Sequence, residues 1–194
     1  MNKAVFLDRD GVINPLVYCT ATQEYEAPHS PADFGIYTWT LKSLQLLKRL
    51  GFITILISNQ PDLAKAKMTL QDMKAIEKML FDFSEENGHL IDQFNYCYHH
   101  PNGIVPEYKQ NCRCRKPGTL FVEQAIEKYD LVVRNCYFIG DQYTDIKCGN
   151  SMGMITIKID NYHSSKKSGT EKPNFNAANL FEAALKIMEL ETAK

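Results

Sequence analysis

The chain lacks the features that would place it in a membrane or on nucleic acid. Its 22 lysines and arginines nearly balance 23 aspartates and glutamates, and the net charge of -1 provides no general attraction for polyanions. No run of about 18 apolar residues is present. Residues 1–3 lead into an apolar run without the pattern of a signal peptide. These absences predict a cytoplasmic protein, with no membrane partner and no nucleic acid bound through overall charge.

The length and composition fit one compact unit. The 194 residues are 44% apolar and 23% charged, and a chain of this size buries about two thirds of its unfolded surface. Residues 1–194 are therefore predicted to form a single domain. Six cysteines would indicate disulfides in a small secreted protein, but without an export signal clustered cysteines favour metal binding.

Apolar runs and helical patterns alternate along the chain. Strands are predicted at five continuous apolar runs, which are residues 4–7, 52–57, 94–98, 136–139 and 154–159. Helices are predicted where apolar residues recur at helical spacing, near residues 41–50, 70–80, 120–129 and 180–187. Because strands covered on both faces read as continuous apolar runs, the pattern predicts an open α/β sandwich with a mainly parallel sheet.

Two carboxylates at the end of the first strand form the most informative motif. Asp8-Arg9-Asp10-Gly11 follows the run 4–7, and the carboxyl ends of parallel strands are where open α/β folds bind ligands. The pair suits phosphoryl transfer, with one nucleophile and one proton donor. An exposed turn or a calcium loop is the alternative. An EF-hand is excluded, because glycine stands at the fourth position of the motif and not at the sixth.

Two segments depart from the alternation of strands and helices. Residues 15–38 follow the carboxylate pair, contain three prolines and show little periodicity. Loops of that length are usually functional, so this excursion is expected to overhang the site. Residues 160–176 are polar and rich in turn formers, which predicts a mobile surface loop before the last helix.

Further polar residues stand at other predicted strand ends and helix starts. Ser58 and Asn59 follow the run 52–57 and could donate hydrogen bonds to phosphoryl oxygens. Lys116 stands just before a predicted helix, and Asp141 follows the run 136–139 and could join Asp8 as a ligand of Mg²⁺. Each has an ordinary alternative, which is a turn, a solvated lysine or a helix cap. Their combination favours a catalytic site.

Clustered cysteines predict a structural zinc site. Cys97-x-His99 is followed after twelve residues by Cys112-x-Cys114, and three thiolates with one imidazole form the closed ligand set of structural Zn²⁺. Buried reduced cysteines are the alternative, but the surrounding loop is polar. The adjacent His100 could replace His99, although alternation with Cys97 favours His99. Ordinary thiols are expected at the remaining three cysteines, Cys19, Cys136 and Cys148.

The predicted zinc loop is also basic. Between residues 97 and 117 there is only one acidic residue, Glu107, and there are four lysines and arginines, which are Lys109, Arg113, Arg115 and Lys116. A zinc staple would hold the arginines near the predicted site, so Arg115 is expected to help bind an anionic substrate. Solvated side chains remain the alternative for the other basic residues.

Taken together, these motifs resemble those of the haloacid dehalogenase superfamily of phosphohydrolases. Four motifs match in order between about residue 4 and residue 160, namely Asp8-x-Asp10, Ser58, Lys116 and Gly140-Asp141-x-x-x-Asp145. The zinc loop joined to Arg115-Lys116-Pro117 resembles the small zinc-containing branch that includes heptose bisphosphate and histidinol-phosphate phosphatases. The resemblance implies a three-layer Rossmann-like sandwich, Mg²⁺ dependence and no large cap domain.

The resemblance also implies a role for each matching residue. Asp8 is the expected nucleophile, and Asp10 the expected acid and base. Asp145 is expected to orient Lys116 or the metal shell. The expected Mg²⁺ ligands are Asp8, the main-chain carbonyl of Asp10, and Asp141. The residues expected to bind phosphate and substrate are Ser58, Asn59, Arg115 and Lys116.

The expected function is Mg²⁺-dependent hydrolysis of a phosphomonoester through an aspartyl-phosphate. A small phosphorylated metabolite is the expected partner, such as a heptose bisphosphate or another sugar phosphate, and the protein is expected to act as a monomer. Histidinol phosphate and polynucleotide 3'-phosphates are the alternative substrates. Two competing functions are considered. One is transfer of the phosphate to an acceptor other than water. The other is a non-enzymatic zinc-stapled module that binds phosphate or nucleic acid.

Overall fold

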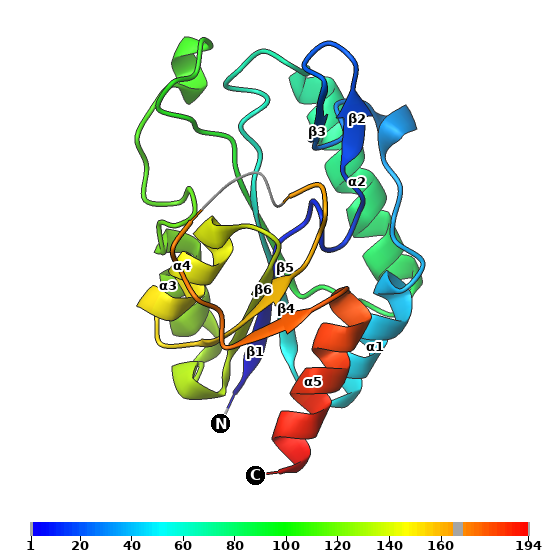
Figure 1. The fold of residues 1–194 in the computed structure, drawn as a ribbon, viewed down its shortest axis with the longest axis vertical. Helices are drawn as coiled ribbons and strands as arrows, with labels where there is room; N and C mark the ends of the chain where they lie inside the picture. The colour runs from blue at the N-terminus through cyan, green and yellow to red at the C-terminus, as the bar shows by residue number, and fades with distance from the viewer. Residues whose placement is uncertain (1, 165–168, 194) are drawn as a thin grey trace.

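The computed structural model describes residues 2–164 and 169–193, and its centre is a parallel β-sheet (Figure 1). The sheet has six strands in the order β5-β4-β1-β6-β7-β8, and every neighbouring pair is parallel. The bounds of its strands are β1 (Ala4–Leu7), β4 (Ile53–Asn59), β5 (Gln93–Cys97), β6 (Tyr137–Gly140), β7 (Ile155–Ile159) and β8 (Phe175–Ala177). The predicted parallel sheet is confirmed.

Helices cover both faces of this sheet (Figure 1). Val5 and Leu7 of β1 pack with α1, α2 and α5, whereas Ala4 and Phe6 pack on the opposite face with α3 and α4. All four side chains of β1 are 0% exposed, which explains why this strand reads as a continuous apolar run. The bounds of the helices are α1 (Thr40–Arg49), α2 (Leu70–Glu86), α3 (Leu120–Tyr129), α4 (Tyr143–Ser151) and α5 (Leu180–Thr192). The three-layer Rossmann-like sandwich is therefore confirmed.

Side-chain caps define two helix starts. The Thr69 hydroxyl accepts a hydrogen bond from the Asp72 N–H at 3.0 Å, and α2 begins at the next residue. The Asn179 side chain accepts from two N–H groups of the first turn of α5. Such caps satisfy donors that have no partner within the helix.

The 15–38 excursion contains regular structure that its sequence pattern does not reveal. It forms an antiparallel hairpin of β2 (Val17–Cys19) and β3 (Glu24–Glu26), followed by the 3₁₀ helix η1 (Pro31–Asp33). Three-residue strands are too short to show a period of two against random alternation. Two further 3₁₀ helices are η2 (Pro106–Tyr108) and η3 (Val133–Asn135).

Two more elements, β8 and α4, escape sequence prediction. The predicted loop at 160–176 includes most of β8, which pairs with β7, and residues 165–168 of that loop lie outside the described residues. Helix α4 contains Gly149, where a Cβ atom would lie 2.6 Å from Thr156 and 2.7 Å from Phe138. Close packing requires glycine there, although glycine lowers helix propensity.

A membrane-spanning helix is not found among the residues described. None of their helices combines the length and apolar character needed to cross a bilayer.

Candidate active site

The polar residues at the ends of three adjacent strands meet at one edge of the sheet. Asp8 follows β1, Ser58 lies near the end of β4, and Asp141 follows β6, while β1 lies between β4 and β6. Carboxylate oxygens of Asp8, Asp141 and Asp145 lie within 4.8 Å of one another. The topology therefore concentrates three buried acidic groups where parallel α/β sheets bind ligands.

Lys116 enters this group from the segment before α3. Its Nζ lies 2.8 Å from Asp8 Oδ1 and 2.7 Å from Asp145 Oδ1, and it donates a hydrogen bond to the Ile57 carbonyl at 2.7 Å. Burial alone would lower the pKa of Lys116, but Asp145 and Asp8 raise it above its usual value. The ammonium group is therefore a fixed positive charge between two carboxylates.

Asn59, a predicted contact of substrate, binds the main chain of Lys116. Its side-chain amide donates to the Lys116 carbonyl at 3.1 Å, and its side-chain oxygen accepts from the Lys116 N–H at 2.9 Å. Both polar atoms are thus engaged by one stretch of main chain. These two bonds fix the position of Lys116, and they leave one hydrogen of the Asn59 amide nitrogen unused.

Asp145 connects Lys116 to the start of α4. While Oδ1 pairs with Lys116, Oδ2 accepts a hydrogen bond from the Gln142 N–H at 2.9 Å. Gln142 is the N-cap residue, so the alternative in which Asp141 caps this helix is wrong. A Cβ atom at Gly140 would lie 2.2 Å from the Asp145 Cβ. Glycine at this position is what allows the carboxylate to approach.

Asp141 has one carboxylate oxygen suited to a cation. Its Oδ2 accepts hydrogen bonds from the Ser164 hydroxyl and, at 3.2 Å, from the Gln142 side chain. Its Oδ1 is buried and has no hydrogen-bond partner among the described residues. A buried, unpartnered carboxylate oxygen near Asp8 fits a hard divalent cation such as Mg²⁺.

Burial also changes the proton affinity of these carboxylates. Burial raises the pKa of Asp8 to about 6, partly offset by Lys116. Burial, together with the charges of Asp8 and Asp145, raises the pKa of Asp141 to about 8. Without a cation, the folded protein therefore retains protons that the unfolded chain releases at lower pH.

Stability is consequently expected to depend on both pH and Mg²⁺. Because the folded pKa values exceed the unfolded ones, Asp8 and Asp141 should lower the unfolding free energy as pH rises from about 4 to about 8. Bound Mg²⁺ would offset that cost, so the increase in Tm on adding Mg²⁺ should be larger at about pH 8 than at about pH 5. Thermal scans of the wild type and Asp141→Asn measure this difference.

The variant supplies the control, because Asp141→Asn removes the carboxylate with the higher pKa and should lose most of the pH-dependent Mg²⁺ effect. An increase in Tm that is the same at both pH values in the wild type would contradict the assignment.

Asp10 is surrounded by hydrogen-bond donors. Its Oδ1 accepts from Arg9 Nη2 at 2.9 Å and from Asn14 at 3.0 Å, and its Oδ2 accepts from Gln60 at 2.6 Å. Arg9, Asn14 and Gln60 are all 0% exposed. Sequence reasoning missed them as site residues. The available signal was an arginine between two aspartates directly after an apolar strand, a position where the arginine is buried and requires internal partners.

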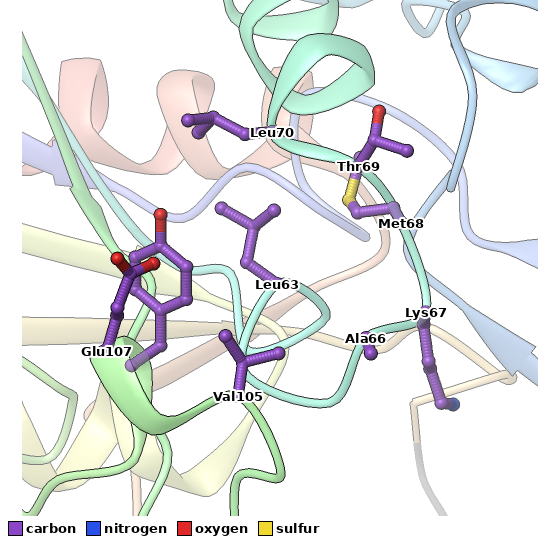
Figure 2. Close-up of a pocket in the computed structure, with 9 residues that line it drawn as sticks. Leu63, Ala66, Lys67, Met68, Thr69, Leu70, Val105 and Glu107 are labelled. Carbon is purple, nitrogen blue, oxygen red and sulfur yellow. The ribbon is translucent and has the colours of Figure 1, made fainter.

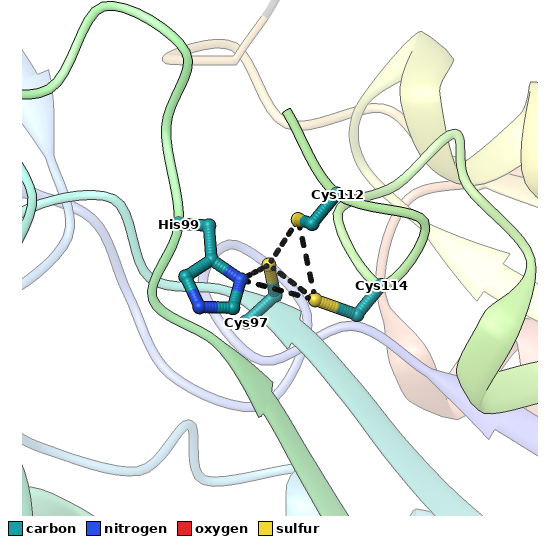
Figure 3. Close-up of side chains that lie close together, drawn as sticks. All are labelled: Cys97, His99, Cys112 and Cys114. Atoms are coloured by element: carbon teal, nitrogen blue, oxygen red, sulfur yellow. Dashed lines mark hydrogen bonds between the residues drawn. The ribbon is translucent and has the colours of Figure 1, made fainter. Parts of the chain in front are cut away.

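The predicted zinc ligands lie close together beside the carboxylate edge of the sheet (Figure 3). They are Cys97, His99, Cys112 and Cys114. The three sulfur atoms lie 3.1–3.6 Å apart, and His99 Nδ1 lies 3.4 Å from the Cys114 sulfur. A tetrahedral zinc site with Zn–S bonds of about 2.3 Å requires sulfur separations of about 3.8 Å, so the arrangement fits zinc after slight expansion. The neighbouring His100 instead accepts a hydrogen bond from the Asn102 N–H at 3.1 Å.

Arg115 extends from this cluster toward a basic surface. It donates a hydrogen bond to the His99 carbonyl at 3.3 Å and is partly exposed. Burial, Arg115 and Lys65 together lower the pKa of His100. The zinc loop and the 61–68 loop therefore bring several basic side chains within electrostatic range of one another.

The β2–β3 hairpin spans the loops on either side of the carboxylates. Glu26 pairs with Lys67 at 2.6 Å, and His29 lies 3.4 Å from Asp62, so both residues bind the 61–68 loop. On the other side, the Tyr25 ring stacks on His163 with centroids 3.5 Å apart. His163 adjoins the residue that contacts Asp141. The excursion is therefore placed above the site.

A separate cavity of about 520 Å³ lies next to the 61–68 loop, bounded by η2 and the start of α2 (Figure 2). Its lining consists of Leu63, Ala66, Lys67, Met68, Thr69, Leu70, Val105, Glu107 and Tyr108. None of the predicted catalytic or metal-binding residues belongs to this lining. The cavity is a neighbour of the carboxylate edge and does not contain it.

Comparisons with known proteins agree with this geometry. A family model described as HAD-hydrolase-like matches residues 113–183. The D-glycero-alpha-D-manno-heptose-1,7-bisphosphate 7-phosphatase of Photorhabdus laumondii is 32% identical over 152 residues, which cover 78% of this chain and 79% of that protein. The D-glycero-D-manno-heptose-1,7-bisphosphate 7-phosphatase of Chlorobaculum tepidum is 30% identical and covers 93% of this chain, with 92% of its own length matched.

The fold is shared with solved structures as well. D,D-heptose 1.7-bisphosphate phosphatase from B. bronchiseptica, crystallised with magnesium and phosphate, superposes with a TM-score of 0.78 at 20% identity. The match covers 98% of this chain and 99% of that protein. The chain therefore belongs to the HAD-like hydrolase family, as a phosphatase in the group that contains the D-glycero-D-manno-heptose-1,7-bisphosphate 7-phosphatases.

Proposed function

We propose that this phosphatase removes one phosphate from a small sugar bisphosphate, of which a heptose 1,7-bisphosphate is the leading candidate. The observation that carries the proposal is the buried ion pair between Asp8 and Lys116, with the unpartnered Asp141 oxygen beside it. A carboxylate, a fixed cation and a cation-binding oxygen together meet the needs of phosphoryl transfer. The names of the relatives supply the sugar.

Asp8 is proposed as the nucleophile. Its Oδ1 already accepts from Lys116 and from the Arg9 N–H at 2.8 Å, which leaves Oδ2 to attack phosphorus. A bond forms between this oxygen and phosphorus while the ester P–O bond breaks. Asp10 gives its proton to the departing alkoxide and later takes one from the hydrolytic water. The water oxygen bonds to phosphorus as the bond between phosphorus and Asp8 Oδ2 breaks, so free phosphate leaves and the Asp8 carboxylate is regenerated.

Mg²⁺ is the proposed cofactor of this site. Asp8, the main-chain carbonyl of Asp10, and Asp141 are the groups that would hold it, and when bound it neutralises charge between the nucleophile and the phosphoryl group. Lys116 contributes a second positive charge at Asp8, and Asp145 keeps that ammonium group in place through its 2.7 Å contact. Ser58 and Lys116 are the proposed contacts of the phosphoryl oxygens.

Zinc is proposed as a structural ion of the Cys97–Cys114 loop. Three sulfur atoms and one imidazole nitrogen lie within 4.8 Å of one another, and this donor set leaves no position for a reacting group. Elemental analysis of protein purified without chelators should find a stoichiometric amount of zinc. The assignment would be refuted by a protein that contains no zinc and whose three cysteines in this loop react fully with thiol reagents.

The basic surface beside the zinc loop supports a substrate with a second anionic group. Arg115 is anchored by the His99 carbonyl and remains partly exposed, with His100 in its electrostatic field. A guanidinium group suits a phosphate that is bound but not hydrolysed. Arg115 is therefore proposed to recognise the phosphate that stays on the product.

Substrate preference tests the proposal. The purified enzyme should release phosphate from a heptose 1,7-bisphosphate with a higher kcat/KM than from sugar monophosphates, histidinol phosphate or an oligonucleotide 3'-phosphate. Arg115→Ala should raise KM for the bisphosphate about tenfold or more, as expected for one lost charged hydrogen bond, and leave monophosphates nearly unchanged. Preference for histidinol phosphate or the oligonucleotide would refute the sugar assignment.

A further inference from the structure

Arg9 and Gln60 form a buried pair beneath two groups of the proposed mechanism. Arg9 donates through Nε and Nη2 to Asp10 Oδ1 at 3.1 and 2.9 Å, and Nη2 also reaches Gln60 Oε1 at 3.0 Å. Gln60 Nε2 donates to Asp10 Oδ2 at 2.6 Å and to Ser58 Oγ at 2.8 Å. Both side chains are 0% exposed. One amide thus joins Asp10, Ser58 and Arg9.

The chemistry of arginine determines which way this amide faces. A guanidinium group has donors and no acceptor, so only the oxygen of Gln60 can face Arg9. The nitrogen must then face Asp10 and Ser58, and its two hydrogens match these two acceptors. Arg9 therefore fixes the orientation of Gln60 without touching Ser58.

That orientation has a consequence for Ser58. Its oxygen accepts the hydrogen bond from Gln60, so its own hydrogen is left to donate to another group. A hydroxyl that is 1% exposed at the sheet edge has the phosphoryl oxygens as its natural acceptor. Asp10, in turn, is held from both oxygens by Arg9, Asn14 and Gln60.

We infer that Arg9 and Gln60 are positioning residues that direct the Ser58 hydroxyl toward the phosphate and hold Asp10 at the leaving group. The inference rests on the proposed roles of Ser58 and Asp10. The cost of the arrangement supports it, because Arg9 Nη1 is buried without a partner among the described residues. A purely structural role is served at lower cost by an apolar side chain.

Two substitutions at Gln60 separate its effects. Gln60→Met keeps the length of the side chain but removes its hydrogen bonds, so the Ser58 hydroxyl stays free to reach phosphate while Asp10 loses a donor. We expect kcat to fall about tenfold with little change in KM. Gln60→Glu adds an acceptor that captures the Ser58 hydrogen and a negative charge that faces Asp10. We expect both a higher KM and a kcat lower by about 10² or more.

The matched control is Gln93→Glu. Gln93 also lies on a strand of the sheet, and its amide donates to Asn95 at 2.9 Å, away from the catalytic carboxylates. This variant should retain the wild-type kcat and KM. Circular dichroism melts of all three variants measure folding separately from activity.

The first turnover of p-nitrophenyl phosphate distinguishes a positioning role of Gln60 from a merely structural role. Its leaving group needs no proton, so Gln60→Met should release the first equivalent of p-nitrophenolate rapidly and then turn over slowly, because Asp10 is still needed as the base. Equal kcat and KM in Gln60→Met, Gln60→Glu and Gln93→Glu would overturn the inference. Equal losses of burst and steady-state rate, accompanied by a lower Tm, would overturn it also. Activity in Asp8→Asn would instead refute the proposed function itself.

Discussion

Asp8→Asn is expected to reduce phosphate release by at least about 10³-fold, since a neutral amide cannot form the covalent intermediate. The thermal stability of the variant should not fall with its activity. Burial raises the pKa of Asp8 to about 6, so the folded protein bears a cost for ionising this group at neutral pH. Asparagine removes that charge and should leave the Tm of the metal-free protein unchanged or higher. Malachite-green assays and thermal scans measure both quantities.

Asp130→Asn is the matched control for this substitution. Asp130 is exposed and adopts φ 48° at the end of α3, a conformation that asparagine also tolerates. It should keep wild-type activity and stability. An Asp8→Asn protein that retains more than about one tenth of the wild-type rate would exclude Asp8 as the nucleophile.

Lys116→Met is expected to be the most destabilising single substitution at the site. The Lys116 ammonium lies 2.8 Å from Asp8 and 2.7 Å from Asp145, and its side chain is 1% exposed. Removing one partner of a buried ion pair costs about 3–5 kcal/mol, because the remaining charge is left without compensation. Turnover should fall by about 10³-fold or more as well. Urea denaturation near neutral pH and steady-state kinetics check the two effects.

A second substitution distinguishes charge from packing. In Lys116→Met combined with Asp145→Asn, one uncompensated carboxylate is gone, so part of the stability should return while activity stays low. Lys78→Met is the surface control, since the Lys78–Asp82 pair is exposed and should contribute less than about 1 kcal/mol. A Lys116→Met protein as stable as this control would contradict the importance of the buried pair.

The sheet and the edge that carries the candidate site were predictable because they depend on strong local signals. Strands buried on both faces appear as apolar runs, and the polar residues that end β1, β4 and β6 necessarily meet once those strands are parallel neighbours. The β2–β3 hairpin and β8 carry no such signal. Each of these three strands has only three residues. Strands β2 and β3 pair with each other and contact Lys67 and His163 through side chains, whereas β8 pairs with β7.

The exact use of each polar atom was beyond sequence reasoning. Asn59 and Gln60 are adjacent amides, yet Asn59 binds the Lys116 main chain while Gln60 reaches Asp10 and Ser58. Which way each side chain points depends on strand pleat and on partners from other strands. The choice between His99 and His100 is different, because alternation from Cys97 already favours His99 in the sequence. His99 faces the sulfur atoms because alternate residues after Cys97 point the same way.

The placement of the β2–β3 hairpin has a consequence for how this protein can diversify. Glu26 and Tyr25 attach the hairpin to Lys67 and His163 through side chains, whereas the proposed catalytic carboxylates Asp8 and Asp141 directly follow strands of the sheet. Exchanging hairpin residues is therefore expected to change the loops around the proposed site and to leave the strands that carry its carboxylates intact. Engineering of substrate preference should accordingly begin in this insert, where a substitution puts the folded sheet at little risk.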